Sequence, residues 1–101
     1  MPNFVKVADA GDVAPGTGRC ITVNGKEIAL FNVGGVFHAL DNTCLHRGGP
    51  LGEGELDGAV VTCPWHGWQY DVTTGRNIMD ESEGVARYDV KVEGGAVLVA
   101  V

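Results

Sequence analysis

The sequence predicts an all-β protein with a single domain, and three observations support this class. The chain has 101 residues, which is the size of one ordinary domain and too short for a core plus a separate catalytic domain. Valine is abundant and the apolar runs are short, as is typical of strands rather than helices. Sixteen glycines and four prolines indicate frequent turns between those strands.

Strands are expected where a short apolar run lies between turn signals, and these runs cover residues 4–8, 20–23, 26–33, 36–40, 88–93 and 96–101. Asn24-Gly25 joins the second and third runs and is the strongest short hairpin signal. Gly34-Gly35 and Gly94-Gly95 mark two further hairpins. In the hairpin at Gly94-Gly95, the alternation of side chains along each strand predicts that Val90, Val92 and Leu98 share a face toward the core.

The middle of the chain differs from both ends. It holds two of the three cysteines, two of the three histidines and both tryptophans, and it is rich in glycine. Its strands, near 59–62 and 69–72, must be short, the shape of 77–86 stays open, and no segment predicts a helix. We therefore expect a β base made by residues 1–41 and 81–101, with a small insert over 42–80.

Two short segments of the insert combine metal-binding residue types. Cys44-Leu45-His46 and Cys63-Pro64-Trp65-His66 are separated by sixteen residues. Each segment supplies one thiolate and one imidazole, and four such ligands can hold a zinc ion or the two irons of a [2Fe–2S] cluster.

The order of the ligand types favours the cluster. Zinc fingers usually place two cysteines in one element and two histidines in another, whereas cysteine and histidine alternate here. If the two loops face each other, both cysteines lie on one side and both histidines on the other, which suits one thiolate-bound and one imidazole-bound iron. We expect Cys44, His46, Cys63 and His66 to bind one [2Fe–2S] cluster, with a structural zinc as the alternative.

Neighbouring residues agree with this interpretation. Gly48, Gly49 and Gly67 permit tight turns close to the cluster, and Trp65 and Trp68 would shield it from water. The remaining cysteine and histidine are expected to be structural. Cys20 lies in a predicted strand and is interpreted as a small buried apolar residue, and His38 follows Phe37 in another strand.

These residues resemble the Rieske family, whose motif is Cys-x-His, a spacer of about this length, and Cys-x-x-His. The string CPWHGWQYDVTTG, residues 63–75, is similar to the second loop of bacterial Rieske ferredoxins and of the Rieske domains in aromatic-ring dioxygenases. LGEGELDG, residues 51–58, is typical of the lead-in. The resemblance covers nearly the whole chain and implies an antiparallel β-sandwich base with a small rubredoxin-like cluster-binding insert.

The departures from the high-potential members of the family are informative. Those proteins link the two loops by a disulfide, and the matching positions here are Gly49 and Trp65. They also place a serine two residues after the second histidine, where this chain has Trp68, while their tyrosine is retained as Tyr70. By resemblance, the Tyr70 hydroxyl points at a cysteine sulfur of the cluster. The missing disulfide and serine imply a potential near the bottom of the Rieske range of about −150 to +300 mV.

The resemblance implies a one-electron carrier rather than an enzyme. It would accept electrons from a flavin-dependent reductase and pass them to an oxygenase such as an aromatic-ring dioxygenase. The alternative is the small Rieske-like subunit of an NADH-dependent nitrite reductase, and a non-redox zinc module is a third class. A chain of this length has no mononuclear-iron domain, so it is not expected to be an oxygenase catalytic subunit.

The net charge and the search for targeting signals limit which partners and which cellular location are expected. Seven basic and thirteen acidic residues give a net charge of −6, which excludes nucleic acid as an expected partner because binding it needs a basic surface. The sequence shows neither a signal-peptide pattern nor an apolar run long enough to cross a bilayer. We therefore expect a cytoplasmic monomer that does not bind membranes.

Overall fold

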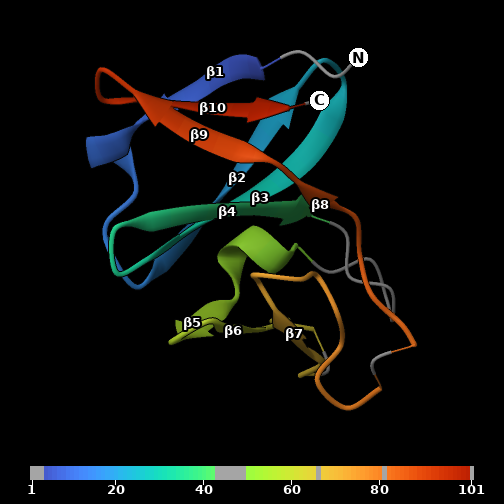
Figure 1. Ribbon diagram of the computed structural model, residues 1–101. Coiled ribbons are helices and arrows are strands. Elements are labelled where there is room, and N and C mark those ends of the chain that lie inside the picture. The colour runs from blue at the N-terminus through green and yellow to red at the C-terminus, as the bar shows by residue number, and fades with distance from the viewer. Residues whose placement is uncertain (1–3, 43–49, 66, 81, 101) are drawn as a thin grey trace.

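The computed structural model describes residues 4–42, 50–65, 67–80 and 82–100. In these residues the chain forms ten strands and two short 3-10 turns (Figure 1). The strands are β1 Phe4–Asp9, β2 Thr17–Val23, β3 Lys26–Val33, β4 Val36–Asp41, β5 Glu55–Asp57, β6 Val60–Thr62, β7 Gln69–Asp71, β8 Arg87–Tyr88, β9 Val90–Glu93 and β10 Ala96–Ala100; the 3-10 turns are η1 Ala10–Asp12 and η2 Leu51–Glu53. The expected all-β class is confirmed.

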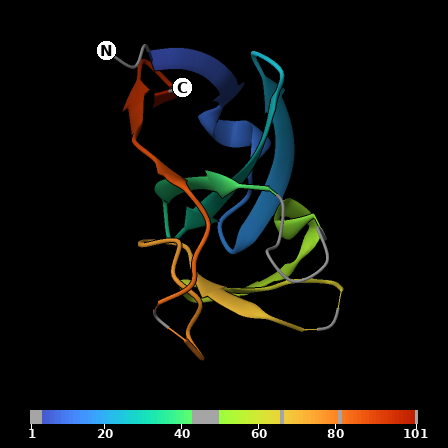
Figure 2. The ribbon, with the colours of Figure 1, turned by 90° about the vertical axis from the view of Figure 1, so that its right-hand side faces the viewer.

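The strands form three antiparallel sheets. The first sheet has the order β1-β10-β9, the second β2-β3-β4-β8, and the third β5-β6-β7. Figures 1 and 2 show the second sheet between the other two, with the first sheet above it and the small third sheet below. The first and third sheets therefore cover opposite sides of the middle sheet.

Strand β3 is buried on both faces because it runs through the centre of this arrangement. Ile28 and Leu30 belong to the core cluster shared with Val97 and Val99 of the first sheet. The alternate residues Ala29 and Phe31 belong to a second cluster, which also contains residues of the third sheet. Successive side chains of a strand point to opposite faces, so one strand contributes to both cores.

Three hairpin turns lie where the sequence predicts them. Asn24 and Gly25 have φ values of 50° and 79° between β2 and β3, which is the left-handed conformation that a two-residue hairpin of this kind requires. Gly34-Gly35 connects β3 to β4, and Gly94-Gly95 connects β9 to β10; all four of these glycines have positive φ. The turn chemistry of the sequence thus sets the register of both base sheets.

The expected strand over 88–93 is wrong as a single element. Tyr88 pairs with Ala39 in the middle sheet, whereas Val90 pairs with Val99 in the first sheet. The chain changes sheet at Asp89, so two short strands replace one.

The core face of the last hairpin is also partly wrong. Leu98 pairs with Lys91, while Val97 and Val99, which pair with Val92 and Val90, are fully buried. Leu98 therefore lies on the face opposite to Val90 and Val92, and β10 fills the core with its valines.

Two segments of the middle region could not be assigned from pattern. Strand β5 has only three residues, two of them carboxylates, and it forms the edge of the third sheet. The open segment 77–86 contains no regular strand or helix among its described residues. Isolated bridges between Tyr70 and Asn77 and between Arg76 and Gly84 hold it instead.

None of the helical turns in the described ranges has the length and apolar character needed to traverse a bilayer.

Candidate metal centre

The β6–β7 hairpin positions the candidate ligand Cys63. In this hairpin, Val61 of β6 pairs with Tyr70 of β7, and Thr62 of β6 pairs with Gln69 of β7. Cys63 follows the last residue of β6, and its amide donates a hydrogen bond of 2.7 Å to the carbonyl of Trp68. Gly67 adopts a φ of 77° in the intervening turn, as expected for a tight turn at this glycine. The hairpin thus fixes the backbone of Cys63 through main-chain contacts.

The side chain of Cys63 is buried in the second core cluster, which also contains Ala29 and Phe31 of β3. Only 1% of the residue is exposed, and its cluster also contains Leu40, Leu51 and Tyr70, which are all fully buried. Leu40 precedes the segment 43–49 and Leu51 follows it. The two ends of the first candidate ligand segment and the start of the second therefore converge on one core.

The remaining predicted ligands, Cys44, His46 and His66, lie outside the described residues, as do Gly48 and Gly49. Among the residues that the structure does describe, no group of three or more His, Cys, Asp or Glu side chains could hold a metal ion. The donor set of the two segments, two thiols and two imidazoles, is the ligand set of a Rieske cluster. The burial of Cys63 in a core shared with both flanks of the other segment fits such a cluster.

Tyr70 is fully buried in the same cluster as Cys63. Its side chain is therefore shielded from bulk water. Trp68 is partly buried and packs against this cluster, whereas Trp65 is 50% exposed. Of the two tryptophans, Trp68 covers the core and Trp65 faces solvent.

Cys20 does not lie in the core as expected. The residue is exposed, and its thiol donates a hydrogen bond of 3.3 Å to the side-chain oxygen of Asn42. Partial burial of the thiol raises the pKa of Cys20. The thiol therefore stays protonated near neutral pH.

His38 is half-buried on β4 and pairs with Phe31 of β3. Burial of the imidazole is the main reason that the pKa of His38 is lowered, and the positive charge of Arg87 acts in the same direction. His38 is therefore neutral near pH 7 and belongs to the middle sheet.

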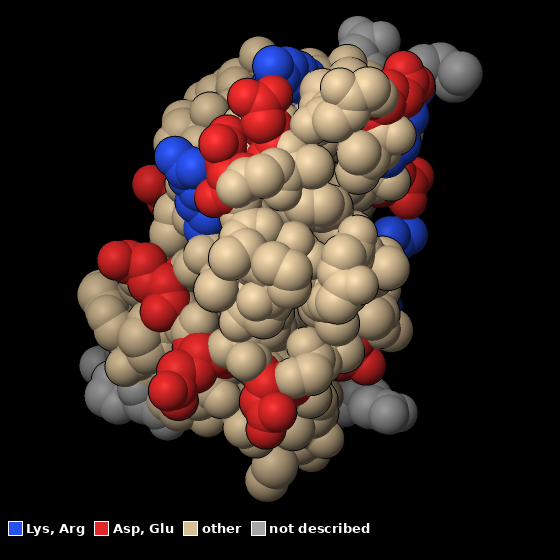
Figure 3. Space-filling model, turned by 90° about the vertical axis from the view of Figure 1, so that its left-hand side faces the viewer, with Lys and Arg blue, Asp and Glu red and all other residues tan. Residues whose placement is uncertain are grey.

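The surface around the third sheet is acidic. Residues 50–80 contain five carboxylates, but only one Lys or Arg, which is Arg76. Figure 3 shows Lys and Arg mainly over the upper half of one face, whereas Asp and Glu also occur over the lower half. The lower half of this face would thus favour a basic partner.

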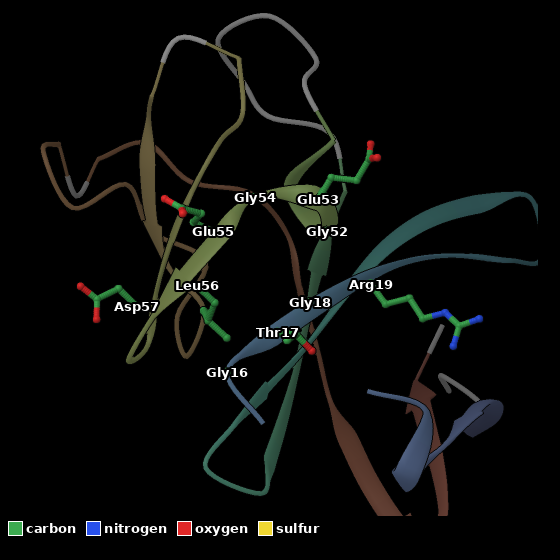
Figure 4. A pocket seen from close by; sticks show the side chains of 10 residues that line it. All are labelled: Gly16, Thr17, Gly18, Arg19, Gly52, Glu53, Gly54, Glu55, Leu56 and Asp57. Carbon is green, nitrogen blue, oxygen red and sulfur yellow. The ribbon is translucent and has the colours of Figure 1, made fainter. Parts of the chain in front are cut away.

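A cleft runs along the seam between the middle sheet and the third sheet (Figure 4). It is lined by Gly16, Thr17, Gly18 and Arg19 on one side and by Gly52, Glu53, Gly54, Glu55, Leu56 and Asp57 on the other. Its carboxylates extend away from the cleft in Figure 4. The cleft therefore marks where the two sheets meet and has no cluster of converging polar groups.

Comparison with known proteins identifies the family. Residues 3–89 match the Rieske [2Fe–2S] domain. The ferredoxin component of the naphthalene 1,2-dioxygenase/salicylate 5-hydroxylase systems of Ralstonia sp. is 35% identical over 98 residues, which are 96% of this chain and 94% of that protein. The chain thus belongs to the Rieske [2Fe–2S] domain family, and a Rieske-type [2Fe–2S] cluster is its cofactor.

Solved structures agree with this assignment. The ferredoxin of carbazole 1,9a-dioxygenase from Nocardioides aromaticivorans IC177 superimposes with a TM-score of 0.90 at 31% identity, covering 97% of each chain. A chain in a complex of reduced oxygenase and oxidized ferredoxin of carbazole 1,9a-dioxygenase gives a TM-score of 0.89 at 36% identity and covers 99% of this chain and 94% of that one. The likeness therefore extends over the whole chain in both sequence and fold.

The nitrite reductase alternative has weaker support. The small subunit of a nitrite reductase superimposes with a TM-score of 0.84 over 98% of this chain, but at only 19% identity. This likeness shows a shared fold alone.

Proposed function

We propose that this protein is a one-electron carrier that takes electrons from a flavin-dependent reductase and delivers them to an oxygenase such as an aromatic-ring dioxygenase. One observation carries the proposal: the chain matches ferredoxin components of dioxygenase systems over nearly its full length and nearly theirs. On the same ground we propose the role of an electron-transfer component rather than that of an enzyme.

Cys44, His46, Cys63 and His66 are the proposed cluster ligands. The motif spacing supports this assignment, and so does the burial of Cys63 beside the flanks of segment 43–49. When bound, such a cluster supplies a reversible one-electron couple. The apolar side chains around Cys63 keep water from the thiolate, and the β6–β7 hairpin holds it in place.

Partner docking is proposed at the end of the molecule that carries the β6–β7 turn. Trp65 is half exposed and precedes His66, and Met79 is 84% exposed in the segment after β7. Asp80 and Glu83 lie beside Met79 at the rim of a pocket that also includes Trp68. Exposed apolar side chains with acidic neighbours suit a partner surface that is apolar and basic.

Electron delivery to an oxygenase can be tested by reconstitution. The purified protein is mixed with the reductase and terminal oxygenase of a naphthalene dioxygenase system, NADH and naphthalene. We expect NADH-dependent product formation that requires this protein and slows as salt is added, because the proposed contact is electrostatic. The Cys63→Ser variant serves as the control without electron transfer.

A parallel reaction tests the alternative. If the protein restored nitrite reduction to a nitrite reductase lacking its small subunit and gave no oxygenase turnover, the nitrite reductase role would replace the one proposed. A monomeric state, a cytoplasmic location and the division into a base, 1–41 with 81–101, and a cluster-binding insert, 42–80, remain predictions that accompany this function.

A further inference from the structure

Asn42 lies at the end of β4, directly before the segment that carries Cys44 and His46. It is a buried polar residue with 5% of its surface exposed. Its backbone amide donates a hydrogen bond of 3.1 Å to the carbonyl of Glu27 on β3. Asn42 is therefore anchored to the middle sheet.

The same residue also holds the far end of that segment. The backbone carbonyl of Asn42 accepts a hydrogen bond of 2.7 Å from the amide of Leu51. Its side-chain oxygen Oδ1 accepts a second one, of 2.8 Å, from the amide of Gly52. One residue thus joins the described residues on the two sides of segment 43–49, with Asn42 before it and Leu51 and Gly52 after it.

A third contact extends this arrangement to β2. The thiol of Cys20 donates to the same Oδ1 atom of Asn42. Gly52 lies so close to β2 that an added Cβ would be 2.8 Å from the backbone nitrogen and from the sulfur of Cys20; Figure 4 shows Gly52 on η2 beside Arg19 of β2. Cys20, Asn42 and Gly52 therefore connect β2, β4 and η2 at the start and end of the ligand segment.

We infer that Asn42 is a positioning residue for the cluster: its side-chain oxygen holds segment 43–49, and with it Cys44 and His46, in the geometry that retains iron. This inference rests on the ligand assignment proposed above. Because outer hydrogen bonds that orient metal ligands affect metal affinity strongly, loss of the Asn42 oxygen weakens iron retention beyond any general loss of stability.

Asn32 provides a matched control for a purely structural role. It is also a buried asparagine, 4% exposed. Its Nδ2 donates to the carbonyl of Val13 at 2.8 Å, and its Oδ1 accepts from the amide of Gly35 at 2.8 Å. Asn32 thus bridges loops with the same chemistry, but those loops belong to the base.

The experiment compares Asn42→Ala with Asn32→Ala in the iron-loaded protein. We measure the free energy of unfolding, the rate of iron transfer to a chelator under native conditions, and the reduction potential. Both variants are expected to be less stable than the wild type, because each leaves buried donors without their acceptor. Only Asn42→Ala is expected to lose iron faster, by about 10- to 100-fold, and to change the potential.

Two further variants keep the inference open to refutation. Asn42→Asp retains an acceptor oxygen and should lose iron almost as slowly as the wild type. Cys20→Ala removes one of the two hydrogen bonds that Oδ1 accepts, so it should speed iron loss in the same direction as Asn42→Ala but by less. Equal rates of iron loss in Asn42→Ala and Asn32→Ala, or in Cys20→Ala and wild type, would overturn the inference. If Cys44→Ser keeps its iron, the ligand assignment itself fails, whatever the Asn42 variants show.

Discussion

The backbone amide of Cys63 donates a hydrogen bond of 2.7 Å to the carbonyl of Trp68. This bond closes the turn between β6 and β7 at Cys63, the first proposed ligand of the second motif. The position of Cys63 is therefore set by the main chain of a short hairpin, while its side chain lies in the core shared with Leu51 and Tyr70. A thiolate held in this way needs little rearrangement to bind a metal.

Replacing Cys63 by serine should abolish cluster binding. The hydroxyl is a much poorer ligand for iron than the thiolate, and metal binding is coupled to folding where the site needs the metal. We expect the loss of visible absorbance and of iron, with a lower free energy of unfolding. Cys20→Ser is the control and should keep the cluster, because Cys20 is not a proposed ligand and a serine hydroxyl can still donate to Asn42. A Cys63→Ser protein with the native visible spectrum would show that this ligand is misassigned.

Removing the hydroxyl of Tyr70 should lower the reduction potential. Tyr70 is fully buried in the cluster of residues that contains Cys63. A hydrogen bond from its hydroxyl to a cysteine sulfur would stabilise the reduced state, which carries one more negative charge, and such bonds to charged groups contribute about 1.5–3 kcal/mol. Only the difference between the two redox states changes the potential, so Tyr70→Phe should lower it by some tens of millivolts while the fold is kept. Voltammetry of both proteins at one pH tests this, and equal potentials would leave Tyr70 as a packing residue.

The sequence predicts the base well because its signals are local. Asn24-Gly25 and the paired glycines at 34–35 and 94–95 require specific turn conformations, so they fix which strands pair. The split at Asp89 has no such signal, since it depends on two sheets competing for one extended segment. The hydrogen bond from Cys20 to Asn42 likewise joins residues more than twenty positions apart, which no local pattern reveals.

The candidate site is predictable in a different way. The motif predicts Cys63 and its partners as ligands from residue types and spacing alone, without any knowledge of the fold. The role proposed for Asn42 could not be predicted in this manner, because its hydrogen bonds with Gly52 and Cys20 depend on how η2 packs against β2.

Gly75→Ala should destabilise the protein more than Gly16→Ala. Both glycines have a similar positive φ, 80° and 83°, but an added Cβ at Gly75 would lie 2.5 Å from the carbonyl oxygen of Val85, whereas the space around Gly16 is open. We expect a cost of about 1–2 kcal/mol at Gly16 from the left-handed backbone, and about 1–3 kcal/mol more at Gly75 from the steric clash. Denaturant unfolding of both variants measures the difference, and equal costs would argue against close packing of segment 77–86 on the β7 turn.

Tyr88 should make stability fall at alkaline pH. Burial raises the pKa of Tyr88 from 10.0 to about 12, with a further contribution from its hydrogen bond to Asp41, in which the hydroxyl donates at 2.8 Å. The folded state therefore holds this proton more tightly than the unfolded state. The resulting stability is fully present below about pH 10 and is lost as pH rises toward 12.

Spectroscopic titration of the phenol and urea unfolding across that range test this prediction, with Tyr88→Phe as the reference. The wild type should lose stability relative to Tyr88→Phe as pH increases. If the Tyr88 phenolate formed at its ordinary pKa, Tyr88 and its contact with Asp41 would add nothing to the pH dependence of stability.

We propose that two thiolates and two imidazoles of this chain bind one Rieske-type [2Fe–2S] cluster. The EPR spectrum of the reduced, purified protein, combined with metal analysis of the same sample, tests this directly. We expect a red-brown protein with two irons per chain and an average g value below that of clusters bound by four cysteines. A colourless protein with one zinc per chain, or a reduced spectrum with the average g value of an all-cysteine cluster, would contradict it.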